Sequence, residues 1–171
     1  MFYYIENYPE QLDDTICVNI NQTFCGIQEL FGHYGKTLRF PYNSITNFSA
    51  FRDVMGDLEW LPEKNISVFH DGLPSLSGQE MNNYLDVLNL IDVEWERFME
   101  RAGITRQYAK EHPEKFIHRD EVTAWWERQP KIFNVYFRKE DESYVKEILQ
   151  KYSKDYRKCI YFDEKGDEYI E

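Results

Sequence analysis

The chain has 171 residues, which suffice for one well-packed domain and would leave two domains cramped. Thirteen Tyr, twelve Phe and four Trp side chains exclude a disordered polymer, because disordered chains carry few aromatic residues. The net charge of −11 argues against binding to nucleic acids or to anionic membranes, since both require clustered cations.

The negative charge is concentrated in the middle of the sequence. Residues 47–100 carry 3 basic and 11 acidic side chains, whereas residues 101–130 carry 6 basic and 5 acidic ones. A segment of this kind is either a solvated surface or a face that meets a cationic partner.

Signals for export, membrane insertion and metal binding are missing from the sequence. The first 14 residues lack the basic, apolar and small-residue order of a signal peptide, and no apolar stretch approaches the roughly 20 residues that span a bilayer. Cysteines 17, 25 and 159 form neither a metal-ligand spacing nor an even disulfide set. We therefore expect a cytoplasmic protein with reduced thiols, without metal or cofactor, and monomeric when free.

The first two thirds of the chain predict strands over residues 15–20 and 66–69 and helices over 26–38, 47–60 and 77–102. The helix at 47–60 is the most regular, because Phe51, Val54, Met55 and Leu58 recur at helical spacing. A proline at position 62 ends it.

The last third is less regular. Residues 104–117 are predicted to be irregular, and a short helix capped by Asp120 carries Trp125 and Trp126. A strand at 132–137, a helix at 142–152 and a strand at 159–162 complete the chain.

Alternating strands and helices predict an α/β domain with a small parallel sheet. We expect a single domain over residues 1–171, with a core at 15–137, an insertion near 103–130 and a C-terminal βα-β extension at 138–171. The strands of the extension are expected to join the same sheet.

A row of polar residues follows the outer face of the helix at 47–60. Ser49, Asp53 and Asp57 recur at i, i+4 and i+8, which places them in one line along the helix. No lysine separates the two carboxylates, so ion pairing within the helix does not explain them. The row is either a solvated face or a surface for a cationic groove.

An enzymatic interpretation rests on His70 and Asp71, which follow a strand where α/β enzymes often place catalytic groups. No glycine-rich phosphate loop, nucleophile elbow or paired-histidine motif accompanies them. Asp71 and Gly72 are also a common residue pair in the turn that follows a strand. We therefore expect no enzyme, and keep this interpretation as the less favoured alternative.

The run from Phe40 to Pro62 resembles the signature of barstar-like ribonuclease inhibitors. Its spacing is fixed over about twenty residues, and the order of strands and helices agrees as well. The matching positions are Pro41, Asn47, Ala50, Phe51, Asp53, Asp57, Leu58, Trp60, Leu61 and Pro62.

The resemblance implies a three-stranded parallel sheet packed with helices, and a second helix that enters a ribonuclease active site with the loop before it. Carboxylates of that helix would occupy the phosphate positions of a cationic nuclease. An acidic residue of the following long helix also contributes in the family, and Asp86, Asp92 and Glu94 are the candidates here. The implied partner-binding residues are Asn43, Asn47, Ser49, Arg52, Asp53, Gly56 and Asp57.

The chain also departs from the family pattern. Ser49 replaces the first Asp, Arg52 replaces an aromatic residue, and the Tyr-Tyr-Gly loop reads Asn, Ser, Ile at 43–45. An arginine would repel the cationic groove of the usual ribonuclease. We therefore expect a different nuclease toxin as partner, with this chain as an immunity protein; the alternative is an interaction or regulatory module that inhibits no nuclease.

Overall fold

The computed structural model describes residues 1–7, 9, 14–41, 45–116, 125–153, 161–163, 165, 166, 168 and 169. The elements follow one another as β1 (Phe2–Ile5), β2 (Thr15–Asn21), α1 (Ile27–Thr37), α2 (Phe48–Met55), β3 (Asn65–Asp71), α3 (Gly78–Glu111), η1 (Pro113–Lys115), η2 (Trp125–Glu127), β4 (Ile132–Arg138), η3 (Lys139–Asp141), α4 (Glu142–Tyr152), β5 (Tyr161–Phe162) and β6 (Glu168–Tyr169).

Four strands form one parallel sheet in the order β1-β4-β3-β2. Alternate side chains of β4 are buried, as the period of two requires: Phe133, Val135 and Phe137. The α/β class is thus confirmed, but the sheet has one strand more than the resemblance implied. The additional strand is β1, which pairs with β4 at the edge of the sheet and was not predicted from the sequence.

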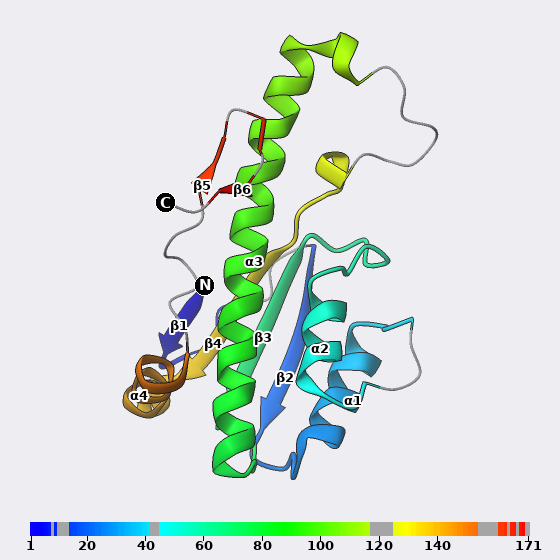
Figure 1. Ribbon diagram of the computed structural model, residues 1–171. Helices are drawn as coiled ribbons and strands as arrows, with labels where there is room; N and C mark the ends of the chain where they lie inside the picture. The colour runs from blue at the N-terminus through cyan, green and yellow to red at the C-terminus, as the bar shows by residue number, and fades with distance from the viewer. Residues whose placement is uncertain are drawn as a thin grey trace.

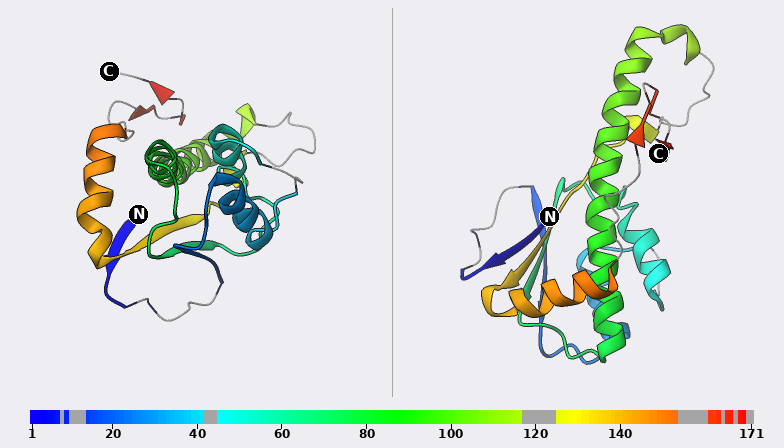
Figure 2. Two further views of the ribbon diagram at one scale, coloured as in Figure 1. Left: turned by 90° about the horizontal axis from the view of Figure 1, so that it is seen from below. Right: turned by 60° about the vertical axis from the view of Figure 1, so that its left-hand side comes forward.

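The helices pack on one face of this sheet, as Figure 2 shows. Apolar side chains of α1, α2, α3 and α4 meet the alternate residues of the strands in one continuous core. On the opposite face, Tyr136 stacks between Tyr3 and Phe69, with ring centroids 4.9 and 4.7 Å apart. The molecule is therefore a two-layer α/β domain.

Helix α3 is the longest element and extends beyond the sheet (Figure 1). A capping box starts it, in which the Ser77 side chain accepts from the Glu80 backbone and Glu80 accepts from the Ser77 backbone. The prediction of an irregular segment at 104–117 was wrong, because the helix continues to Glu111 and ends just before Pro113. No helix in the described part of the chain has the length and apolar character needed to cross a membrane.

Helix α2 is shorter than predicted. It ends at Met55 rather than near residue 60, because Gly56 caps it and Leu58 takes a backbone φ of 43°. A φ in this range does not continue a right-handed helix. The segment 57–64 is therefore a loop that leads into β3.

The C-terminal region differs from its prediction in one respect. Helix α4 forms as expected, but β5 pairs antiparallel with β6 in a separate two-stranded sheet and does not join the main one. Residues 159 and 160 of the predicted last strand, and residues 120–124 of the predicted short helix, lie outside the described residues. Trp125 and Trp126 belong to η2, and Trp126 is buried.

Candidate functional site

Helix α2 presents a polar outer face because its inner face is fixed in the core. Asn47 is its N-cap and accepts a hydrogen bond from the Ala50 backbone N–H at 2.9 Å. The apolar residues Phe51, Val54 and Met55 are buried, while Ser49, Arg52 and Asp53 are exposed.

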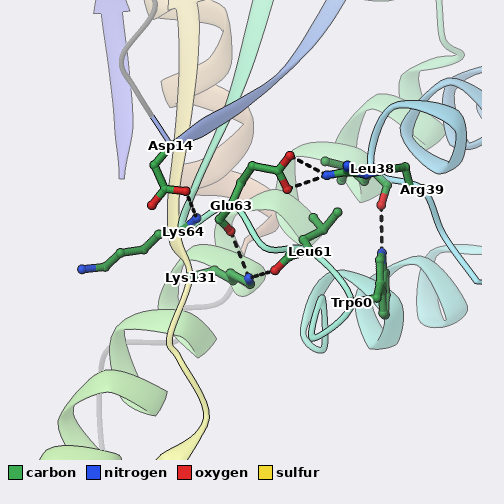
Figure 3. A network of polar contacts seen from close by, with 8 residues as sticks. All are labelled: Asp14, Leu38, Arg39, Trp60, Leu61, Glu63, Lys64 and Lys131. Carbon is green, nitrogen blue, oxygen red and sulfur yellow. Dashed lines mark hydrogen bonds and ion pairs between the residues drawn. The ribbon is translucent and has the colours of Figure 1, made fainter.

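The loop after α2 is held by a network of hydrogen bonds (Figure 3). The indole N–H of Trp60 donates to the Leu38 carbonyl oxygen at 2.8 Å. The buried ammonium of Lys131 donates to the carbonyl oxygens of Leu61 and Glu63, at 2.5 and 2.9 Å. These hydrogen bonds fix the conformation of the loop between α2 and β3, and with it the position of the C-terminal end of α2.

Sheet topology brings the end of α2 close to the segment before β4. Strands β3 and β4 are parallel neighbours, so both begin at the same end of the sheet, where Asn65 is paired with Ile132. The loop after α2 and the residues before β4 therefore meet at this end of the sheet, beside α3. Here lies a cavity of about 460 Å³, the α2 groove, which is lined by Arg52, Asp53, Gly56, Asp57, Glu94, Trp95, Phe98 and Arg128.

The two carboxylates of the groove differ in their surroundings. Asp53 is exposed and has no hydrogen-bond or ion-pair partner among the residues that the structure describes. Asp57 lies 3.9 Å from an Arg128 nitrogen, which is too far for a hydrogen bond, and Arg128 pairs more closely with Glu59. Asp53 is thus the carboxylate that is most available to a partner.

Arg52 does not stand as an isolated cation. Its Nε donates to Glu94 of α3 at 3.0 Å, and a second guanidinium nitrogen pairs with the same carboxylate. The expected repulsion of a cationic partner is therefore offset by a carboxylate within the same groove.

The three candidate acidic residues of α3, Asp86, Asp92 and Glu94, differ in their position relative to the α2 groove. Glu94 lines the groove. Asp92 is buried and pairs with the amino group of Met1. Asp86 does not line the groove. Glu94 is thus the acidic residue of α3 that lies beside α2.

The structure brings together four of the seven residues predicted to bind a partner: Arg52, Asp53, Gly56 and Asp57. Ser49 of α2 and Asn47 just before it lie outside the groove lining, and the Asn47 side chain caps the helix. Asn43 lies outside the described residues. Sequence reasoning missed Trp95, Phe98 and Arg128; only the local excess of basic residues in 101–130 pointed toward the last of these.

The residues of the enzymatic interpretation do not form a site. His70 is completely buried, with Nδ1 3.1 Å from the Tyr136 carbonyl oxygen and Nε2 2.9 Å from the Tyr84 hydroxyl. Burial lowers the pKa of this imidazole to about 3. Asp71 is exposed and paired with Arg138, so a surface substrate would not meet both groups. Within the described residues, no three His, Cys, Asp or Glu side chains could hold a metal ion together.

A family model described as Barstar (barnase inhibitor) matches residues 18–109, which is more than half of the chain. The chain belongs to the barstar family. No match was found among curated proteins or among solved structures. The family segment starts in β2 and ends within α3, so it contains all of α2 and the loop that follows.

Part of the groove lies beyond the barstar segment. Arg128, which lines the groove, comes after residue 109, from the stretch that leads into β4. Trp125 of η2, which lies outside this lining but close to Phe98, also comes after residue 109. The barstar helix α2 is thus flanked in this chain by side chains that the family match does not include.

Proposed function

We propose that this protein inhibits a ribonuclease by placing the α2 groove and its carboxylates over the nuclease active site. Ribonuclease sites hold phosphate through cations, so a carboxylate can take the place of a phosphate and form charge-assisted hydrogen bonds. The protein then acts by occlusion, without catalysis of its own. The family description as an inhibitor of barnase supports this reading.

The observation that carries the proposal is the state of Asp53. It is exposed at the groove, on a helix whose opposite face is locked in the core, and no described residue neutralises it. A carboxylate that has no internal partner keeps its full attraction for an incoming cation. Its helix and the following loop are already fixed, so little ordering is needed on binding.

We further propose that the target is a nuclease toxin and that the chain serves as its cytoplasmic immunity protein. The pairing of Arg52 with Glu94 and of Arg128 with Glu59 makes the surface mixed in charge. A partner that fits it must carry cations opposite Asp53 and tolerate guanidinium groups nearby. This requirement distinguishes the expected target from a nuclease with a uniformly cationic groove.

The test is the dissociation constant of complexes with a purified barnase-type ribonuclease and with the product of the neighbouring gene, measured by calorimetry. Asp53→Lys should weaken binding by about 30-fold or more, which corresponds to about 2 kcal/mol, because an interfacial charge pair becomes a repulsion. Glu147→Lys is the control, since this exposed residue of α4 changes the net charge equally at a distance from α2. Equal affinities for the two variants would show that Asp53 is not at the interface.

A further inference from the structure

A second hollow adjoins the α2 groove on the side of η2. This hollow, the arginine groove, has a volume of about 360 Å³ and shares Arg52, Glu94 and Phe98 with the α2 groove. Glu94, Arg97, Phe98 and Arg101 follow one face of α3 at helical spacing, which is why they line it together. The complete lining is Arg52, Glu94, Arg97, Phe98, Arg101 and Trp125.

The three arginines of this groove are held differently. Arg52 is paired with Glu94. Arg101 donates from Nε to the Gly166 carbonyl oxygen at 2.7 Å, and its guanidinium lies 4.4 Å from the centre of the Trp125 ring. Arg97 has no hydrogen-bond or ion-pair partner within the part of the chain that the structure describes.

The local charge is therefore opposite in sign to that of the whole chain. One carboxylate and three guanidinium groups line the arginine groove, whereas the protein as a whole carries a net charge of −11. Trp125 and Phe98 form its apolar wall, with ring centroids 6.0 Å apart. Arginine beside aromatic rings is a composition enriched at binding hot spots.

We propose that the arginine groove is a second contact site for the same partner, in which Arg97 binds a carboxylate side chain of the nuclease. The inference rests on the proposed inhibitor function and specifies its partner. The nuclease then presents cations to Asp53 and an acidic residue to Arg97, side by side. A guanidinium matches a carboxylate with two parallel hydrogen bonds, so this contact also fixes the orientation of the complex.

A protein carboxylate fits this groove better than an RNA phosphate does. Asp53, Asp57 and Glu94 line the adjoining α2 groove, so the polyanionic backbone of RNA would meet carboxylates as soon as it left the arginines. The net charge of −11 repels a polyanion at longer range as well. A single acidic side chain flanked by basic ones meets neither penalty.

The experiment compares the dissociation constants of the nuclease with the wild-type chain and with four variants: Arg97→Glu, Arg97→Gln, Asp53→Lys and Lys110→Glu. Lys110 is an exposed residue near the end of the same helix and provides the matched charge control. Arg97→Glu should weaken binding at least tenfold, and Arg97→Gln by less, while Lys110→Glu stays within twofold of the wild type. Reversing acidic residues at the rim of the nuclease site one at a time should identify one that restores the affinity of Arg97→Glu.

The outcomes separate this inference from the function on which it rests. If Asp53→Lys weakens binding and Arg97→Glu behaves like Lys110→Glu, the inhibitor function stands and the second contact site is refuted. If the wild-type chain binds no nuclease, both fail. Binding of a fluorescent single-stranded RNA of about twelve nucleotides that is lost in Arg97→Glu would overturn the carboxylate assignment in favour of phosphate.

Discussion

At the scale of single residues, the core contains a chain of three polar side chains that do not line the α2 groove: His70, Tyr84 and Tyr34. The backbone carbonyl of Tyr136 can only accept, so Nδ1 of His70 carries the proton and donates to it. Nε2 then accepts from the Tyr84 hydroxyl, which lies 2.8 Å from the Tyr34 hydroxyl. All three side chains are fully buried, and the hydrogen bonds satisfy groups that would otherwise be costly in the core.

This arrangement predicts acid sensitivity. Because burial lowers the pKa of His70 from 6.5 to about 3, only the unfolded chain binds this proton between those values. This proton therefore leaves the free energy of unfolding unchanged above pH 6.5. As the pH falls from 6.5 toward 3, it lowers the free energy of unfolding by up to about 1.4 kcal/mol per pH unit. His70→Gln should therefore flatten the dependence of the free energy of unfolding on pH between 6 and 4, measured by urea denaturation.

Tyr34→Phe is the matched control for this measurement. It removes a hydroxyl of the same network and keeps the imidazole, so it should lower stability at neutral pH and leave the acid dependence as in the wild type. An unchanged pH dependence in His70→Gln would show that other groups cause the acid sensitivity.

At the scale of elements, the position of α2 depends on the loop that follows it. Lys131 directly precedes β4, and its ammonium is buried beneath residues 61–63, where burial lowers its pKa. It ties the segment before β4 to the segment before β3. The position of the α2 groove is thus set by a residue that does not line it.

Lys131→Met should lower the free energy of unfolding by about 1–3 kcal/mol, because the carbonyl oxygens of Leu61 and Glu63 lose their donor in a buried place. Lys64→Met provides the comparison, since the Lys64 side chain extends away from the network in Figure 3. Its change in stability should stay within about 0.5 kcal/mol. Equal effects of the two substitutions, measured by urea denaturation, would refute the anchoring role of Lys131.

The elements also show what the sequence could and could not predict. Periodicity located α1, α2, β3 and β4, because each of these buries one face against a broad core. It missed only the end of α3, residues 103–111, since a helix that leaves the sheet needs only a narrow apolar stripe. It missed β1 because this short edge strand is defined by pairing with β4, more than a hundred residues away.

The candidate site was predictable to a similar extent. Helical spacing placed Ser49 and Asp53 correctly on the outer face of α2, but the predicted row was wrong at Asp57, which lies in the loop after the helix ends at Met55. The partner of Arg52 was not predictable, because Glu94 comes from another helix and is selected by packing. Arg128 reaches the groove only because β3 and β4 begin at the same edge of the sheet.

At the scale of the whole molecule, a strongly acidic chain carries a groove of mixed charge beside α2. The net charge of −11 should accelerate the encounter with the proposed cationic nuclease and repel the RNA on which such a nuclease acts. The barstar segment supplies the helix that carries Asp53, and the chain beyond residue 109 supplies Trp125 and Arg128. The proposed contact surface thus combines residues of the family segment with residues that follow it.

The most direct test of this account is RNA cleavage by the nuclease that binds the chain, titrated with the purified protein. Cleavage should fall linearly and stop at one chain per nuclease, and Asp53→Lys should shift the curve to much higher concentration. Undiminished cleavage in the presence of a saturating, bound chain would contradict it. The α2 groove would then be an interaction surface that leaves the nuclease active site open.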